Sequence, residues 1–162
     1  MHEQSRKYRV LFLCTGNSAR SILAEFLLRR LDARRFETFS AGATPKGRVN
    51  PFVLELLRDG YQIDASAARS KSLTELSAES FDFVITVCDR AREACPVWPG
   101  QPIVAHWSFE DPDAAVGDAA RRAAVQQAAV QIDRRLRLFA ALPIESLDRL
   151  KLGDAASAIG RS

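Results

Sequence analysis

The stretch from Tyr8 to Leu31 constrains the fold of this chain more strongly than any other part of the sequence. Residues Tyr8–Cys14 (YRVLFLC) are mostly apolar and rich in β-formers, which predicts a buried strand. A Thr-Gly-Asn-Ser turn follows, and apolar side chains then recur at helical spacing, at Ile22, Leu23, Phe26, Leu27 and Leu31. We therefore expect a strand, a tight loop and a helix in direct succession.

The same alternation repeats further along the chain. Strands are predicted at Phe36–Ser40, Phe81–Cys88 and Pro102–Trp107, and the second of these is nearly all apolar, as a strand covered on both faces should be. Because strands alternate with helices, we expect an α/β fold, a single three-layer sandwich with a four-stranded parallel sheet. Ligands of such sheets bind beyond the carboxyl ends of the strands, where Cys14 and Cys88 are both expected.

Helices complete this predicted domain. Asn50-Pro51 predicts the start of a helix that Gly60 ends. An alanine-rich segment between about Ala114 and Leu142 predicts a long helix, whose apolar face would hold Val125, Ala129, Ile132, Leu136 and Phe139. We expect one domain over residues 8–143. Residues 144–162 are predicted to be a partly mobile extension, in which a short amphipathic stretch precedes a small, polar tail from Gly153.

Composition limits the classes of protein to which the chain can belong. With 162 residues, 47% hydrophobic and 27% charged, it has the size of one globular domain with a core. The net charge of +3 is small and its arginine clusters are dispersed, so nucleic acid is not suggested as a partner. No run approaches the roughly 20 apolar residues of a membrane span, and the polar first residues do not resemble a signal peptide. We expect a cytoplasmic, monomeric protein without membrane, metal or cofactor.

The loop between the first strand and its helix carries the clearest chemical signal. Cys14 is followed by five residues and then Arg20. Backbone N–H groups of such a turn and of the helix N-terminus converge on one point, which makes a nest for an anion. The guanidinium of Arg20 can grip two oxygens of a tetrahedral oxyanion. The predicted oxyanion-binding residues are Thr15, Gly16, Asn17, Ser18, Ala19 and Arg20.

Cys14 itself is the predicted nucleophile. The positive field of the loop should stabilise a thiolate, so we expect Cys14 to titrate below the free value of about 8.5. Ser21 can donate its hydroxyl to the sulfur. The alternative is a buried thiol at a strand end with Arg20 as a surface cation. The strand before the loop, the turn within it and the helix after it disfavour that alternative.

These motifs carry a resemblance to a known family. The sequence CTGNSARS after VLFL, with Asp111-Pro112 far downstream, resembles the low-molecular-weight protein tyrosine phosphatase fold and, within it, the thioredoxin-coupled arsenate reductases. The resemblance covers about Val10 to Leu138. Further stretches that fit the reductase branch are Ser40-Ala41-Gly42, Val49-Asn50-Pro51, Ile63-Asp64, Val84–Cys88, Cys95-Pro96 and His106–Pro112.

The resemblance implies a nucleophile, an acid and a loop support. Cys14 would attack phosphorus or arsenic, and Asp111 would supply the proton for the leaving oxygen. Pro112 would restrain the loop after that aspartate, although Asp-Pro is also an ordinary turn signal. Ser40 matches a residue that supports the anion loop. Some relatives bind potassium beside this loop, but the chain has Lys71 where they have an acidic ligand, so we expect no potassium dependence.

Two further cysteines separate reduction from hydrolysis. In the mechanism of the resembled reductases, Cys14 forms a thiol-arsenate adduct, Cys88 attacks Cys14 to expel arsenite, and Cys95 then attacks Cys88. Thioredoxin would reduce the resulting Cys88–Cys95 disulfide, although relatives with other cysteine sets use glutathione or mycothiol. Taken singly, Cys88 and Cys95 could be core thiols. A zinc site of the three cysteines with His106 is disfavoured, because the spacings do not resemble paired zinc ligands.

The residues after Pro112 favour a small substrate. Phosphatases of the resembled fold generally present tyrosines there, whereas this chain has Asp-Ala-Ala-Val-Gly at residues 113–117. Trp98, Trp107 or Phe109 could supply apolar surface from elsewhere. We therefore expect an arsenate reductase. The alternatives are a protein tyrosine phosphatase that works through a phosphorylated Cys14, and an oxyanion sensor without activity.

Overall fold

A four-stranded parallel sheet forms the centre of the computed structural model, which describes residues 6–89 and 98–162. Its strands are β1 (Tyr8–Cys14), β2 (Phe36–Gly42), β3 (Phe83–Thr86) and β4 (Ile103–His106). They lie in the order β2-β1-β3-β4 and all pair in parallel. The predicted α/β fold with a four-stranded parallel sheet is thus confirmed, and β3 pairs with β1 at the centre of the sheet.

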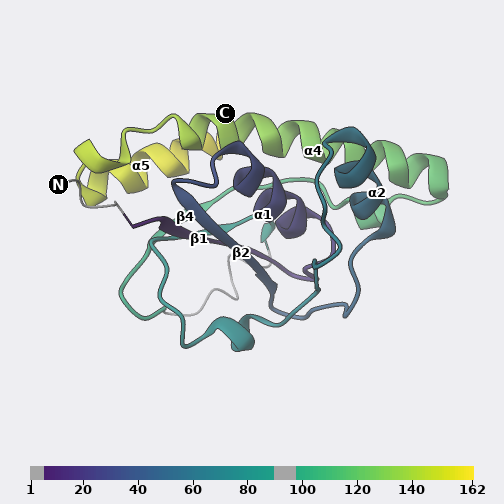
Figure 1. Cartoon of the computed structure of the whole chain (residues 1–162), viewed down its shortest axis with the longest axis horizontal. Coiled ribbons are helices and arrows are strands. Elements are labelled where there is room, and N and C mark those ends of the chain that lie inside the picture. The colour runs from purple at the N-terminus through teal and green to yellow at the C-terminus, as the bar shows by residue number, and fades with distance from the viewer. Residues whose placement is uncertain (1–5, 90–97) are drawn as a thin grey trace.

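The described helices lie on both sides of this sheet, most of them on one side (Figure 1). Helices α1 (Arg20–Leu31), α2 (Pro51–Gly60), α4 (Asp118–Ala140) and α5 (Arg149–Ile159) gather on one side in Figure 1. The short helix η1 (Leu73–Leu76), drawn in teal, lies with its loops on the other side. No helix in the described parts of the chain is long and apolar enough to cross a membrane.

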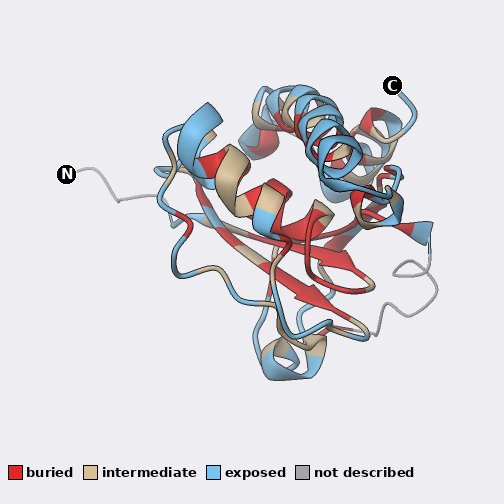
Figure 2. Ribbon diagram, turned by 90° about the vertical axis from the view of Figure 1, so that its right-hand side faces the viewer, coloured by how far each residue is buried: buried red, intermediate tan, exposed pale blue. Residues whose placement is uncertain are grey.

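The core lies between the sheet and the helices, where the buried residues of Figure 2 face one another. The face of α4 that the sequence predicts is the buried one, with Val125, Ala129, Ile132, Leu136 and Phe139 fully enclosed. Phe139 meets Phe83 of β3 edge to face, with ring centroids 5.0 Å apart. Helix α4 therefore fixes α1 and the central strands in one packed body.

The C-terminal segment contains a helix that the sequence analysis did not predict. Within the extension of residues 144–162, whose partial mobility stays a prediction, residues Arg149–Ile159 form α5, which begins with a hydrogen bond from the Lys151 N–H to the Asp148 carboxylate. Its buried face, with Leu152, Ala156 and Ile159, lies beside β4, and the Trp107 indole N–H donates to the carbonyl of Ala156 at 2.9 Å. Alanine and glycine carry little hydrophobic signal in a sequence. They nevertheless allow the helix to approach β4 closely, since a Cβ at Gly160 would clash with the His106 carbonyl.

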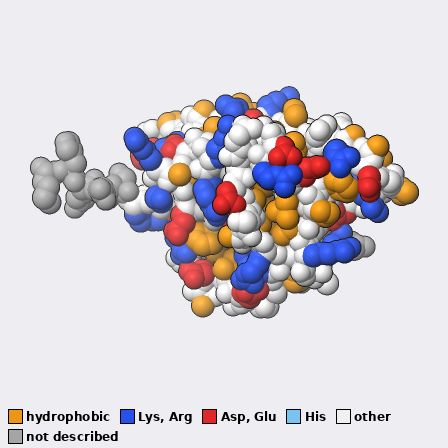
Figure 3. Space-filling model, turned by 45° about the vertical axis from the view of Figure 1, so that its right-hand side comes forward, with side chains coloured by type: hydrophobic (Ala, Val, Ile, Leu, Met, Phe, Trp, Pro, Cys, Tyr) orange, Lys and Arg blue, Asp and Glu red, His pale blue; other side chains and the backbone are white. Residues whose placement is uncertain are grey.

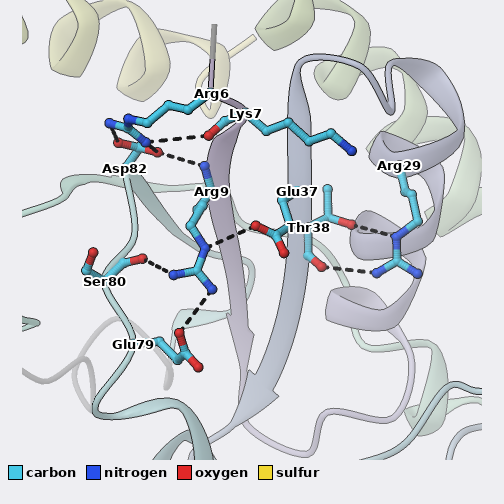
Figure 4. Close-up of polar contacts among 9 residues, drawn as sticks. All are labelled: Arg6, Lys7, Arg9, Arg29, Glu37, Thr38, Glu79, Ser80 and Asp82. Carbon is cyan, nitrogen blue, oxygen red and sulfur yellow. Dashed lines mark hydrogen bonds and ion pairs between the residues drawn. The ribbon is translucent and has the colours of Figure 1, made fainter. Parts of the chain in front are cut away.

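Charged side chains tie the amino-terminal end of the sheet (Figure 4). Arg9 of β1 donates to Glu37 of β2 and to Glu79 on the segment before β3. The Asp82 carboxylate accepts two bonds from the Arg6 guanidinium and one from the Arg9 N–H. Elsewhere, cationic and anionic side chains are interspersed on the face drawn in Figure 3. The charged side chains therefore form local ion pairs, and the described residues on the face in Figure 3 carry no strong patch of one sign.

Replacement of Asp82 should weaken this end of the sheet in a pH-dependent way. Burial raises the pKa of Asp82, but the bonds from Arg6 and Arg9 outweigh burial and hold the pKa below its ordinary value. The stabilisation is therefore present above pH about 4, the unfolded value, and is lost as pH falls through the lower folded value. We expect Asp82→Asn to lower the free energy of unfolding by about 1 kcal/mol at pH 7.

Urea titrations between pH 7 and pH 3 would check this prediction, with the gap between wild type and variant narrowing below about pH 4. Asp59→Asn is the control, because the Asp59 carboxylate is exposed and, among the described residues, pairs with its exposed neighbour Arg58 alone. A gap that widens toward acid would contradict the assigned role of Asp82.

Candidate active site

The residues after β1 form a buried turn, the anion loop (residues 14–20), that runs directly into α1. Asn17 stands at its centre with a φ of 47°, a left-handed conformation that Asn tolerates better than most residues. Its side-chain N–H2 donates to Ser21 at 2.8 Å and to Ser40 at 3.0 Å, and its oxygen accepts from the Lys71 N–H. Ser40 thus lies beneath the loop, where the sequence places a supporting residue.

Carbonyl groups of the anion loop are engaged by the segment that follows β2. The backbone N–H groups of Ala43, Thr44, Lys46 and Asn50 donate to the carbonyls of Cys14, Thr15, Gly16 and Ser18 respectively. Gly42 permits this close approach, because a Cβ there would lie 2.7 Å from the Thr15 carbonyl oxygen. With the carbonyls held toward residues 43–50, the loop can present N–H groups to an anion on its other side.

A pocket of about 500 Å³ lies over this loop. The structure brings Cys14, Arg20, Cys88 and Asp111 to its wall, although they are far apart in the sequence. The Arg20 guanidinium is anchored by a 3.0 Å bond to the Phe109 carbonyl and lies 3.8 Å from the Asp111 carboxylate. The other residues of the described wall are Thr15, Gly16, Ser18, Ala19, Thr44, Lys46, Asp89 and Asp113.

Aromatic side chains do not contribute to the described wall of the pocket. The three that the sequence offered as apolar surface, Trp98, Trp107 and Phe109, are all buried in the core. Phe109 contributes only its backbone carbonyl, which holds Arg20. The described wall of the pocket therefore offers no aromatic ring against which a bulky aryl group could pack.

The acidity of Cys14 differs from its prediction. A hydrogen bond with Cys88 and then burial raise its pKa well above the ordinary value, while the Ser21 hydroxyl and the Arg20 charge act in the opposite direction. Ser21 and Arg20 thus have the predicted effects, but a second sulfur outweighs them. Two sulfurs that share a hydrogen bond titrate as a pair, and the first thiolate opposes loss of the second proton.

Cys88 follows β3 and is buried with Cys14 at the carboxyl edge of the sheet. Its sulfur lies 3.2 Å from the Thr15 hydroxyl, so it has a polar partner in the anion loop itself. Cys95, the third predicted cysteine, lies outside the described residues. The structure therefore brings two of the three predicted sulfurs together.

His106 lies at the end of β4, where both of its ring nitrogens have polar partners. Its Nδ1 contacts the Thr86 hydroxyl at 2.7 Å, and its Nε2 contacts the Asp89 carboxylate at 2.9 Å. The imidazole therefore links β3 and β4 to the residue that directly follows Cys88.

Lys71 lies beside the support of the anion loop. Burial lowers the pKa of its ammonium, and the nearby Glu25 carboxylate opposes this effect. Glu25 is itself buried and accepts from Ser40 at 2.6 Å and from Arg29 at 2.9 Å. The Lys71 ammonium donates to the Arg69 carbonyl at 3.2 Å, and the potassium independence expected from Lys71 stays a prediction.

Sequence reasoning missed Asp113 and Lys46 as members of the site. Both line the pocket, and they form an ion pair with a 2.5 Å contact. Residues 113–117 drew attention only for their lack of aromatics. The sequence does contain an aspartate two residues after Asp111. Its neighbours in the sequence, however, do not indicate which residues it binds.

The parallel sheet and the buried cysteine–arginine loop at its carboxyl edge define a phosphatase-like α/β protein. The chain belongs to the low molecular weight phosphotyrosine protein phosphatase family, whose family model matches residues 9–139. This match confirms the resemblance seen in the sequence. It ends before α5, which lies outside the matched residues.

Several relatives are arsenate reductases. The arsenate reductase of Oceanobacillus iheyensis is 34% identical over 132 residues, which cover 81% of this chain and 94% of that protein. A solved thioredoxin-dependent arsenate reductase from Corynebacterium glutamicum has 31% identity and a TM-score of 0.64, covering 82% of this chain and 60% of that one. A solved arsenate reductase in the phosphate binding state has 27% identity and a TM-score of 0.64, covering 80% of this chain and 97% of that one.

Removal of the second sulfur should make Cys14 more acidic. Cys88 is the largest cause of the raised pKa, so Cys88→Ala should shift the pH midpoint of Cys14 alkylation downward. Ser21→Ala is the matched opposite, since it removes a bond that lowers the pKa, and should shift the midpoint upward. Iodoacetamide labelling across pH, followed on the Cys14 peptide by mass spectrometry, measures both. An unchanged midpoint in Cys88→Ala would show that the sulfurs do not interact.

Proposed function

We propose that this protein is an arsenate reductase that uses Cys14 as the nucleophile and Cys88 as the first resolving thiol. The observation that supports this most directly is the second sulfur inside the anion pocket, hydrogen-bonded to Cys14. Hydrolysis of a phosphate ester needs one nucleophile and water. Reduction of As(V) to As(III) needs two electrons, and a pair of adjacent thiols can supply them.

The first step of the proposed reaction uses the anion loop. Backbone N–H groups and Arg20 would hold the equatorial oxygens of arsenate, and the Cys14 thiolate would attack arsenic. Asp111 would give a proton to the departing oxygen, which leaves as water, and a thiol-arsenate adduct would remain. Arg20 is already oriented for this task by the Phe109 carbonyl.

Reduction follows in the second step. The Cys88 thiolate would attack the Cys14 sulfur, so that an S–S bond forms, the S–As bond breaks and its electron pair stays on arsenic as arsenite leaves. Thr15 lies where its hydroxyl can donate to the attacking Cys88 sulfur. Cys95 would then attack Cys88, which frees Cys14 and leaves a Cys88–Cys95 disulfide.

Thioredoxin is the proposed electron donor, and a cytoplasmic monomer is the proposed working form. A compartment that keeps thiols reduced suits a site that must begin each turnover with free sulfurs. The similarity to a thioredoxin-dependent reductase supports this choice of donor.

Coupled turnover tests the proposal. Purified protein with thioredoxin, thioredoxin reductase and NADPH should oxidise NADPH only when arsenate is added. Cys14→Ser and Cys88→Ser should each reduce the rate to background, because each lacks a sulfur that the electron balance requires. Mass spectrometry after one turnover without reductant should find a Cys88–Cys95 disulfide. Free thiols after arsenate treatment would contradict the relay.

A protein tyrosine phosphatase is the second candidate, and the family match is the observation that favours it. In that case Cys14 and Asp111 would be sufficient, and Cys88 would serve at most as redox protection. Cys88→Ser should then leave the hydrolysis of phosphotyrosine peptides largely intact, at rates that exceed those on simple aryl phosphates. Weak hydrolysis of aryl phosphates alone would not separate the candidates, because both use the same loop.

A further inference from the structure

The carboxylate of Asp113 is the most heavily bonded acidic group beside the pocket. One oxygen accepts from the Ser18 hydroxyl and from the Lys46 ammonium, both at 2.5 Å. The other accepts from the Asn50 side-chain amide at 2.6 Å. We call these four residues the Asp113 clasp. Each carboxylate oxygen is occupied by a donor from another part of the chain.

The clasp joins three segments that otherwise approach the pocket separately. Ser18 belongs to the anion loop, Lys46 and Asn50 to the segment between β2 and α2, and Asp113 to the Asp-Pro loop (residues 110–114). Asn50 also caps α2 by accepting from the Phe52 N–H, so its position is set by the helix. Ser18, Lys46 and Asp113 line both the anion pocket and a neighbouring cleft of about 360 Å³. The clasp is therefore the wall between these two cavities.

Asp113 also orients Asp111 directly. Its backbone N–H donates to the Asp111 carboxylate at 2.9 Å, on the same oxygen that lies 3.8 Å from the Arg20 guanidinium. The Asp111 side chain is 44% exposed, and the bond from the Asp113 N–H is shorter than its contact with Arg20. Its direction thus depends on where the backbone of residue 113 is held.

The negative charge of Asp113 is neutralised by its partners, which allows this acidic residue to lie beside the anion pocket. A bare carboxylate beside an anion pocket would repel the ligand. Burial raises the pKa of Asp113, but the bonds from Lys46, Ser18 and Asn50 outweigh burial and hold it below its ordinary value. The Lys46 side chain reaches Asp113 across Gly16, where a Cβ would lie 3.1 Å from its Cε. Asp113 is therefore ionised and paired, and it does not serve as a second proton donor.

We propose that Asp113 is a positioning residue, whose bonds to Ser18, Lys46 and Asn50 hold the Asp-Pro loop closed on the anion loop and so aim Asp111 at the oxygen that leaves. This inference rests on the proposed function, in which Asp111 is the acid. Misplacement of a catalytic group by about 1 Å can cost roughly 100-fold in rate.

Hydrolysis of two aryl phosphates with different leaving groups tests this role. An acid matters most for phenyl phosphate, whose leaving phenolate is basic, and least for p-nitrophenyl phosphate. We expect Asp113→Ala to lower kcat for phenyl phosphate by roughly 10- to 100-fold and kcat for p-nitrophenyl phosphate by several-fold less. The single side-chain oxygen of Asp113→Asn can keep two of the three acceptor contacts. This variant should therefore show a smaller loss of kcat for phenyl phosphate than Asp113→Ala. Asp118→Asn is the matched control, because Asp118 lines only the neighbouring cleft.

Inhibition by inorganic phosphate separates positioning from damage to the loop. The inhibition constant should change less than about 3-fold in Asp113→Ala, because the acid acts in the transition state and the anion is bound by the loop. Thermal unfolding verifies that the variants are folded. Equal losses of kcat on both substrates, a matching loss of phosphate affinity, or no loss at all would each overturn the proposal.

Asp111→Asn distinguishes the failure of this inference from the failure of the proposed function. A strong leaving-group effect in Asp111→Asn without one in Asp113→Ala would reject the positioning role of Asp113 and would still support Asp111 as the general acid. If Asp111→Asn showed no leaving-group effect, Asp111 would not be the general acid, and the positioning role of Asp113 would be rejected with it. A wild type that hydrolyses aryl phosphates but does not reduce arsenate would reject the reductase and leave the leaving-group comparison valid.

Discussion

Everything at this site depends on the hydrogen bonds that hold the carbonyls of residues 14–18 against residues 43–50. An anion nest works only if its carbonyl dipoles are satisfied on the side away from the ligand. Gly42 makes this possible, since any side chain there would collide with the loop. Asn17 completes the turn from the inside through Ser21 and Ser40. The pocket is therefore a property of two adjacent strands and the segments that follow them.

The second sulfur changes what such a pocket can do. Arg20 and Ser21 favour a Cys14 thiolate, yet the contact with Cys88 raises the Cys14 pKa above its ordinary value. In the proposed reaction this contact has a use, because the bond that would form in the second step joins these same two sulfurs. A pair that shares one proton also supplies a thiolate and a thiol together, whichever sulfur is ionised first.

Several long-range contacts converge on the segment between β4 and α4. Helix α5 packs against β4 and bonds to Trp107, Arg20 bonds to the Phe109 carbonyl, and Asp113 bonds to Ser18 and Lys46. Arg135 of α4 adds a bond to the Ser108 carbonyl and lies over the Phe109 ring at 4.6 Å. The loop that carries Asp111 is thus held from the core, from the anion loop and from the C-terminal helix.

The sequence by itself determined the strand-loop-helix unit, the parallel sheet and the position of Cys14 and Arg20, because each follows from periodicity and turn chemistry over a few neighbouring residues. Only the tertiary structure decided the rest. Ser18 and Asp113 are 95 residues apart, and the effect of Cys88 on Cys14 requires two strands to meet. Helix α5 buries Leu152, Ala156 and Ile159 beside β4, which lies far earlier in the chain. Packing between distant segments sets burial and charge contacts, and local sequence does not encode them.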